Sequence, residues 1–305
     1  MNILVTGATG FIGSHLVRRL LKLGHTLFII TRPHSDLSRI NDILDNLIQV
    51  SSDPTLGAIH ELFQKNAIDG VIHLATYYRK EDSKEEEKNM LETNIDFPYR
   101  LLIIAQQYGS TFFINTGTCF EYSPSLVSIN EHSLIQPFNY YASTKFKFED
   151  KLIESLQDSN LKALTLKLFF PYGEQDNNKL VRLLVESLIK KNEFHVTKGE
   201  QYLSYTYVHD IVDAYILALS HIKNMRSSYD IFNIGGTPIK VSNIFDTLEE
   251  ISNKKGFIVR DKEYAKNEIM RMYTESEKAK KVLGWNQKFN LTEGLRKTYN
   301  YYLQY

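Results

Sequence analysis

A tyrosine and a lysine stand four residues apart in the segment NYYASTK, at Tyr141 and Lys145. On a helix, this spacing puts both side chains on one face. A tyrosine titrates at about pH 10 in water, so it is a poor acid or base at neutral pH. A neighbouring ammonium favours the phenolate, and we therefore expect Lys145 to lower the pKa of Tyr141. Tyr140 has Thr144 at the matching position and lacks this partner.

Thr116, Gly117 and Thr118 place two hydroxyls around a glycine, directly after the apolar run at residues 112–114. Such a strand end is either a turn or a place where a substrate oxygen meets the protein. Threonine can hydrogen-bond an oxygen, but it cannot act as a base at neutral pH. As a site, the segment predicts that a substrate oxygen is held there without proton abstraction by these residues.

The segment TGATGFIG, residues 6–13, follows the first predicted strand and opens a helix. Its glycines, Gly7, Gly10 and Gly13, permit a tight turn, let the backbone approach a pyrophosphate, and let the helix pack on the strand. The helix N-terminus supplies N–H groups and a positive dipole for the phosphates. The pattern predicts a bound dinucleotide rather than a purely structural turn.

The end of the second predicted strand indicates which dinucleotide is bound. A carboxylate there hydrogen-bonds an unphosphorylated ribose, but this chain has Thr31, Arg32 and Ser35 before its first acidic residue, Asp36. Arg32 and Ser35 can hold a 2′-phosphate through charge-assisted hydrogen bonds. The segment favours NADP(H) over NAD(H), the alternative being that Arg32 is a solvated surface residue.

Short β-branched runs alternate with longer amphipathic stretches in the first half of the chain. The predicted strands are residues 3–6, 27–31, 47–50, 70–74, 111–114 and 163–168. The predicted helices include residues 11–23, 89–108, 141–156 and 179–191. This alternation indicates a parallel, doubly wound α/β sheet of the Rossmann type. We expect a dinucleotide-binding domain over residues 1–168, with a return segment near 207–235, and a smaller substrate-binding lobe over residues 169–305.

Lysine plus arginine (36) balances aspartate plus glutamate (36), so we expect no binding to nucleic acid or to a membrane surface. The N-terminus MNILVTG lacks the features of a signal peptide. No apolar run reaches the roughly 18 residues of a membrane span. Cys119 is the only cysteine, which excludes a disulfide within the chain and a CxxC metal site. We expect a cytoplasmic protein without a metal.

Several motifs occur in family order along the 305 residues: TGATGFIG at 6–13, VIHLA at 71–75, YASTK at 141–145, YVHD at 207–210, NIGG at 233–236 and LGW at 283–285. They resemble the extended short-chain dehydrogenases/reductases, the NAD-dependent epimerase/dehydratase family. More narrowly, VIHLAT, INTGT, KGEQ before YVHDIV, and NEIM before LGW are similar to nucleotide 4-keto-6-deoxyhexose reductases of the CDP-abequose synthase type.

The resemblance implies roles for residues at matching positions. Tyr141 would exchange a proton with the substrate oxygen, Lys145 would bind the nicotinamide ribose, and Thr116 would orient that oxygen. With the residues argued above, the expected cofactor-binding set is Gly7, Thr9, Gly10, Phe11, Ile12, Gly13, Thr31, Arg32, Ser35, Leu74, Ala75, Tyr141, Lys145 and Phe170. The expected substrate-binding set is Thr76, Tyr77, Thr116, Thr118, Tyr141, Pro171 and Arg271.

Two departures from the family pattern bear on the reaction and the substrate. The 4,6-dehydratases carry Thr-Asp-Glu where this chain has Thr-Gly-Thr at 116–118, and Glu121 cannot replace either carboxylate without a register change. Dehydration is therefore disfavoured. An arginine that contacts the substrate diphosphate in the family is replaced by Leu203. Arg271 either serves the diphosphate instead or is an exposed helix residue.

These observations predict an NADPH-dependent reductase that acts on the C4 keto group of a nucleotide-linked 4-keto-6-deoxyhexose, in deoxysugar or surface polysaccharide biosynthesis. An NAD-dependent nucleotide-sugar 4-epimerase is the alternative. A non-catalytic NADP-sensing module is the third reading, disfavoured by Tyr141 and Lys145. The resemblance alone implies a homodimer formed through the helices at about 90–108 and 141–156.

Overall fold

A computed structural model describes residues 1–53, 55–78 and 83–304. Contacts between Cα atoms divide the chain into two compact units. Unit 1 comprises Met1–Ser123, Leu134–Lys167 and Ala214–Phe232. Unit 2 comprises Pro124–Ser133, Leu168–Asp213 and the residues from Asn233 onward.

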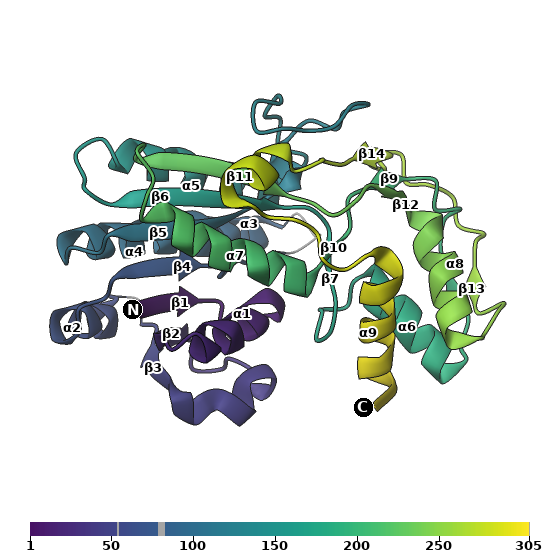
Figure 1. Cartoon of the computed structure of the whole chain (residues 1–305), viewed down its shortest axis with the longest axis horizontal. Coiled ribbons are helices and arrows are strands. Elements are labelled where there is room, and N and C mark those ends of the chain that lie inside the picture. The colour runs from purple at the N-terminus through teal and green to yellow at the C-terminus, as the bar shows by residue number, and fades with distance from the viewer. Residues whose placement is uncertain (54, 79–82, 305) are drawn as a thin grey trace. The chain divides into compact units, whose positions relative to one another are not determined.

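A seven-stranded sheet runs through unit 1, and over the described residues its strand order is β11-β6-β5-β4-β1-β2-β3 (Figure 1). The strands are β1 (Asn2–Thr6), β2 (Thr26–Thr31), β3 (Leu47–Ser51), β4 (Gly70–His73), β5 (Phe112–Thr118), β6 (Lys162–Leu168) and β11 (Tyr229–Ile234). Neighbouring strands from β3 to β5 are parallel. The strand order reverses beside β1, where doubly wound sheets bind ligands at the carboxyl ends of their strands. The predicted Rossmann-type α/β fold is confirmed.

Helices cover both faces of this sheet, with α1 and α7 on one face and α4 and α5 on the other (Figure 1). The helices are α1 (Phe11–Lys22), α2 (Gly57–Lys65), α3 (Lys84–Leu91), α4 (Phe97–Gln107), α5 (Tyr140–Ser155) and α7 (Val208–Ile222), with shorter helical segments at Ser38–Asn46, Glu92–Asp96 and Cys119–Glu121. Only the second part of α7, from Ala214, belongs to unit 1.

The core of unit 1 follows from the two periodicities of the sequence. Alternate strand residues, such as Leu4, Val71 and Phe113, point to one face, where they pack with Leu102 of α4 and Leu152 of α5. β4 is buried along its whole length, as expected for an inner parallel strand with helices on both faces. This packing holds the carboxyl ends of the strands in fixed positions.

The strand predicted at residues 111–114 is longer than expected, because β5 continues to Thr118. The ladder passes through Asn115, which pairs with His73 of β4 and donates from its side chain to Thr165 of β6 at 3.2 Å. Gly117 and its flanking threonines therefore form the last residues of a strand rather than a turn after it.

Unit 2 is built from helices and short strand pairs. Its helices are α6 (Leu180–Lys190), α8 (Val241–Ser252), α9 (Leu291–Gln304), the start of α7, and the segment Ala279–Leu283. Its strands are β7 (Pro171–Tyr172) with β10 (Thr206–Tyr207), β9 (Tyr202–Leu203) between β12 (Ile239–Lys240) and β14 (Arg271–Met272), and β13 (Ile258–Val259) with β8 (Phe194–His195). α6, α8 and α9 pack against one another.

Two further findings concern the described part of the chain only. No helix in residues 1–53, 55–78 and 83–304 is long and apolar enough to cross a membrane. The same residues contain no group of three or more His, Cys, Asp or Glu side chains that is arranged to hold a metal ion.

The packing of α1 gives a test of unit 1. Leu20 is fully buried on the sheet side of α1, whereas Leu23, at the end of the same helix, is 46% exposed. Leu20→Ala should lower the free energy of unfolding by about 2–5 kcal/mol, because it leaves a cavity, and Leu23→Ala by less than about 1 kcal/mol. Urea denaturation of both variants measures this, and equal losses would contradict the described packing.

Candidate active site

The glycine-rich turn leaves no room for a side chain at Gly7 or at Gly13. Gly7 has φ of +70°, and a Cβ atom there would lie 2.7 Å from the backbone nitrogen of Ala75. A Cβ atom on Gly13 would lie 2.0 Å from the carbonyl oxygen of Gly7. The N-cap of α1, Gly10, provides no side-chain cap, and the first turn holds no acidic residue. This helix N-terminus therefore suits an anionic ligand such as a dinucleotide pyrophosphate.

The end of β4 lies directly beside this turn. Ala75 donates its backbone N–H to the hydroxyl of Thr6 at 3.1 Å, and the same hydroxyl lies 2.8 Å from Nδ1 of His73. His73 is completely buried, which lowers the pKa of its imidazole well below the ordinary value. It packs in the core beside the rings of Phe113 and Phe148. The structure thus brings Leu74 and Ala75 next to the glycine turn.

The end of β2 carries no carboxylate next to Thr31. Arg32 is exposed, and its backbone N–H donates to the Ser35 hydroxyl at 2.8 Å, which ties Ser35 into a tight turn. Arg39 was missed by sequence reasoning. Its guanidinium donates to the carbonyl oxygen of Thr9 at 3.4 Å, which brings a second cation to the glycine-rich turn.

Thr116 takes part in hydrogen bonds that link three elements. Its hydroxyl donates to the carbonyl oxygen of His73 at 2.7 Å and lies 2.5 Å from the hydroxyl of Tyr215 on α7. A carbonyl only accepts, so the single proton of Thr116 is used there and Tyr215 is the donor in the second bond. No sequence motif indicated Tyr215, which lies 99 positions after Thr116 along the chain.

Tyr141 and Lys145 lie on the first turns of α5, which Asn139 caps by accepting from the backbone N–H of Ala142 at 2.9 Å. The ring of Tyr78 contacts that of Tyr141 edge to face, with centroids 4.9 Å apart. The ordered start of α5 therefore holds the predicted acid–base tyrosine against a second aromatic ring.

Burial controls the ionisation of this pair. Burial raises the pKa of Tyr141 to about 12, although a hydrogen bond with Thr76 opposes the change. Burial lowers the pKa of Lys145 to about 8, and the carboxylates of Glu121 and Glu149 oppose it. The expected lowering of the Tyr141 pKa is therefore wrong, because loss of water around the phenolate dominates and the charge of Glu121 acts in the same direction. Tyr141 is a neutral phenol at neutral pH.

Asn94 organises the segment after β4. Its side-chain oxygen accepts from the hydroxyl of Thr76 at 3.1 Å and from the backbone N–H of Tyr77 at 2.8 Å. Its amide nitrogen donates to the carbonyl oxygen of Tyr77 and to the hydroxyl of Thr144 on α5. Asn94 is completely buried, and no motif predicted it. It fixes two predicted substrate residues relative to α5.

Thr118 and Glu121 face away from solvent. The Thr118 hydroxyl accepts from the backbone N–H of Phe120, and the Thr118 N–H donates to Oε1 of Glu121 at 2.7 Å. Glu121 also forms an ion pair with Lys167 at 2.8 Å, and both side chains are fully buried. Thr118 therefore caps a short turn, and the nearest carboxylate is bound within the protein.

Three predicted residues belong to unit 2. Phe170 has φ of +34°, and its ring lies 5.5 Å from that of Tyr205. Pro171 begins β7. Of the two alternatives for Arg271, a diphosphate contact or an exposed helix residue, the structure agrees with exposure. Arg271 lies in strand β14, however, and not in a helix. Leu203, in β9, is buried in the position where the family pattern has an arginine.

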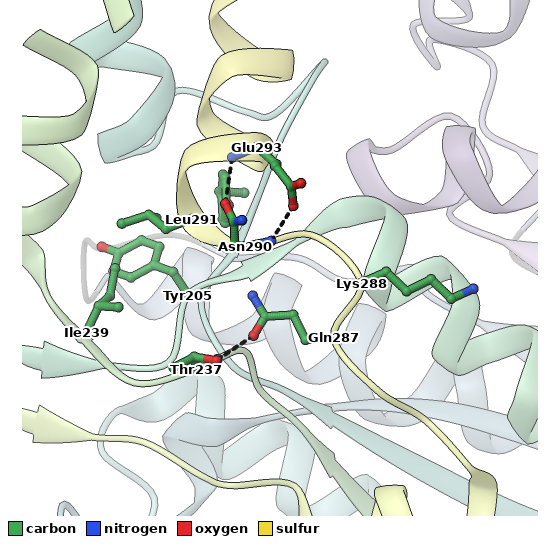
Figure 2. A pocket seen from close by; sticks show the side chains of 9 residues that line it. Tyr205, Thr237, Ile239, Gln287, Lys288, Asn290, Leu291 and Glu293 are labelled. Atoms are coloured by element: carbon green, nitrogen blue, oxygen red, sulfur yellow. Dashed lines mark hydrogen bonds between the residues drawn. The ribbon is translucent and has the colours of Figure 1, made fainter. Parts of the chain in front are cut away.

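Unit 2 also contains a cavity of about 500 Å³, lined by Tyr205, Ile239, Leu291 and neighbouring residues. Figure 2 shows hydrogen bonds among four of its lining residues: Asn290 and Glu293 each accept from the other's backbone N–H, and Gln287 accepts from Thr237. No predicted cofactor or catalytic residue lines it. The carboxyl edge of the unit 1 sheet is the better candidate site.

The close backbone contacts at Gly13 allow a direct test of dinucleotide binding. Gly13→Ala would push a methyl group against backbone that cannot move aside, so binding of NADPH or NADH should weaken by about tenfold or more. Gly57→Ala is the control, since its Cβ would meet only the movable Thr55 side chain, at 3.2 Å. Fluorescence titration measures both, and unchanged affinity in a folded Gly13→Ala protein would contradict the assignment.

Comparison with known proteins identifies the family of this chain. Residues 3–235 match the NAD dependent epimerase/dehydratase family. CDP-abequose synthase of Salmonella typhimurium is 28% identical over 305 residues, which cover 96% of this chain and 95% of that protein. A putative UDP-glucose 4-epimerase of Methanocaldococcus jannaschii is 26% identical, with coverage of 98% and 97%.

A solved structure agrees over the whole chain. UDP-glucose 4-epimerase of Thermotoga maritima, determined with UDP-glucose, has a TM-score of 0.89 and 28% identity, and the match covers 100% of this chain and 99% of that one. The family expected from the motifs is confirmed. The chain is a member of the NAD-dependent epimerase/dehydratase family, within the extended short-chain dehydrogenases/reductases.

Proposed function

We propose that the protein reduces the C4 keto group of a nucleotide-linked 4-keto-6-deoxyhexose, in deoxysugar or surface polysaccharide biosynthesis. The observation that carries this proposal is the composition of the strand end: Thr116, Gly117 and Thr118 offer hydroxyls only. The nearest carboxylate, Glu121, is fully buried and bound to Lys167. Proton abstraction from a sugar carbon has no base in this strand, which argues against dehydration and leaves hydride transfer with proton transfer by Tyr141. The arginines after β2, which suit NADPH, favour net reduction over epimerisation.

Tyr141 is the proton donor to the sugar oxygen. Its raised pKa keeps the phenol protonated at neutral pH, which suits an acid in the direction of reduction. Lys145 binds the nicotinamide ribose. To orient the substrate oxygen, Thr116 turns its hydroxyl proton from the His73 carbonyl toward the keto group, while Tyr215 continues to donate to Thr116. The bound nicotinamide cofactor supplies the hydride. Thr76, Tyr77 and the other predicted substrate residues bind the sugar nucleotide.

The cofactor proposed is NADPH. Support comes from Arg32 and Arg39, two guanidinium groups after β2, and from the absence of a carboxylate beside Thr31. Asp36, the first carboxylate, accepts the backbone N–H of Ser38 at 2.9 Å. A 2′-phosphate gains charge-assisted hydrogen bonds from arginine, whereas an unphosphorylated ribose finds no carboxylate acceptor.

An NAD-dependent nucleotide-sugar 4-epimerase is the second candidate. The epimerase of Thermotoga maritima is as similar in identity as the CDP-abequose synthase of Salmonella typhimurium, at 28% each. The family description also names NAD. An epimerase regenerates its cofactor in each cycle, so denaturing the purified protein should then release stoichiometric NAD, whereas the reductase should consume added NADPH.

We also propose that the enzyme works in the cytoplasm as a homodimer. A single cysteine, Cys119, which is buried, fits a reducing compartment. Ile103 of α4 and Ile153 of α5 are each 40% exposed on the helices that the family resemblance assigns to the dimer.

Neighbouring tyrosines provide a matched test of the proton donor. Tyr141→Phe should lower the rate of NADPH oxidation with a keto-sugar substrate by about 100- to 10,000-fold, because the general acid is lost. Tyr140→Phe, one residue away on α5, should stay close to wild type. The assay follows reduced nicotinamide with a panel of nucleotide 4-keto-6-deoxysugars, and near-normal turnover by Tyr141→Phe would refute the assignment.

The two arginines give a test of cofactor choice. Replacing Arg32 and Arg39 with alanine should weaken NADPH binding by about tenfold or more, through loss of bonds to the 2′-phosphate, and leave NADH binding within about twofold. Arg100→Ala, on α4, serves as the charge control. An equal loss for both cofactors would argue against a 2′-phosphate contact.

A further inference from the structure

Behind the end of β5 lies a cluster of three buried charged residues, Glu121, Glu149 and Lys167, here called the buried charge cluster. Nζ of Lys167 lies 2.8 Å from Oε2 of Glu121 and 3.2 Å from Oε1 of Glu149. The side chains of Lys167 and Glu121 are 0% exposed and that of Glu149 is 7% exposed. The Lys167 ammonium also lies over the ring of Tyr122, 4.8 Å from its centroid.

Such a cluster is costly to bury. Each ion loses hydration worth several kcal/mol, and apolar residues of similar volume often give equal or greater stability. The cluster therefore calls for a role other than stability. None of its three residues takes part in the proton transfer proposed for Tyr141.

Its position indicates that role. Tyr141, Lys145 and Glu149 follow one another at intervals of four on α5, so they share one face of the helix. Glu121 is bonded to the backbone N–H of Thr118, at the substrate end of β5. The cluster thus connects the face of α5 that carries Tyr141 and Lys145 to the end of β5, through Lys167 of β6.

Gly117 provides the space that the cluster occupies. A Cβ atom at this position would lie 2.9 Å from Cγ of Lys167, 3.0 Å from Oε1 of Glu121 and 3.0 Å from the Thr165 methyl group. For a larger residue to fit, the stem of Lys167, Oε1 of Glu121 or the Thr165 methyl group would have to shift. The glycine in the Thr-Gly-Thr segment therefore has a structural reason that the sequence did not show.

The cluster acts on the site through charge. Burial lowers the pKa of Lys145, and the Glu121 and Glu149 carboxylates oppose that effect. Burial alone would lower the pKa of Lys167, but the same two carboxylates raise it above its ordinary value. Burial, and next the charge of Glu121, raise the pKa of Glu149.

Titratable groups surround this region from the elements packed on α5. They are His73 on β4, Glu121 and Tyr122 after β5, Lys167 on β6, Tyr229 on β11, Glu87 on α3, and Tyr140, Tyr141, Glu149 and Asp150 on α5 itself. Glu121 and Glu149 are the two carboxylates that favour the charged form of Lys145.

We propose that the buried charge cluster is a set of positioning residues that keeps the ammonium of Lys145 charged inside the protein. Glu121 and Glu149 supply the negative potential, and Lys167 holds both carboxylates in place. The proposal rests on the proposed function only for the use made of Lys145. The ionisation of Lys145 itself can be measured without substrate.

The test follows the lysine side chains by NMR in the full-length protein labelled with ¹³C at lysine Cε. Lys145→Arg assigns the Lys145 signal. In the unsubstituted protein Lys145 should titrate at about pH 8, and in Glu121→Gln about one pH unit lower or more. Glu154→Gln, exposed on the same helix, should leave the titration unchanged. An unchanged Lys145 titration in Glu121→Gln overturns the proposal.

Glu149→Gln keeps the test decisive if Glu121→Gln does not fold. An amide keeps the shape of the carboxyl group, so folding should tolerate it. Burial raises the pKa of Glu149 to about 7, so the substitution still removes a negative charge near pH 8, where Lys145 titrates. The same downward shift of Lys145 supports the proposal, and no shift overturns it. A shift in a protein that turns over no keto-sugar contradicts only the proposed function, whereas an active protein without the shift contradicts only the role of the cluster.

Discussion

The close approach of Gly7 to Leu74 and Ala75 is the constraint on which the rest of the site depends. Without side chains at Gly7 and Gly13, the first turn of α1 meets the ends of β1 and β4 at backbone contact distance. The hydroxyl of Thr6 then reaches both Ala75 and His73. His73 carries the connection further, because its carbonyl oxygen accepts from Thr116. A continuous set of hydrogen bonds therefore runs from the glycine-rich turn to the end of β5.

Local spacing explains which features could be predicted from the sequence. The strands, the glycine-rich turn and the Tyr141–Lys145 pair each depend on residues a few positions apart, whose geometry is set by helix or strand periodicity. The fold class follows from the alternation of such elements. Tyr215, Asn94 and Arg39 depend on contacts between distant segments, so no motif indicated them.

The ionisation of Tyr141 shows a second limit of sequence reasoning. Helical spacing put Tyr141 and Lys145 on one face of α5, but it gave no measure of burial. Loss of hydration decides the outcome here and raises the pKa of Tyr141 rather than lowering it. Exposed pairs such as Lys65 with Glu61, at 71% and 67% exposure, contribute little by comparison, because water screens them.

Gly117 also bears on how new activities can arise in this scaffold. An evolutionary path toward a dehydratase would need a carboxylate at the strand end, and aspartate at 117 would be the simplest single step. That step would bring a third acidic side chain against the Glu121–Lys167 ion pair, in a space where even a methyl carbon lies 2.9 Å from Lys167. An aspartate at 117 would therefore require the side chains of Lys167, Glu121 or Thr165 to move or change as well.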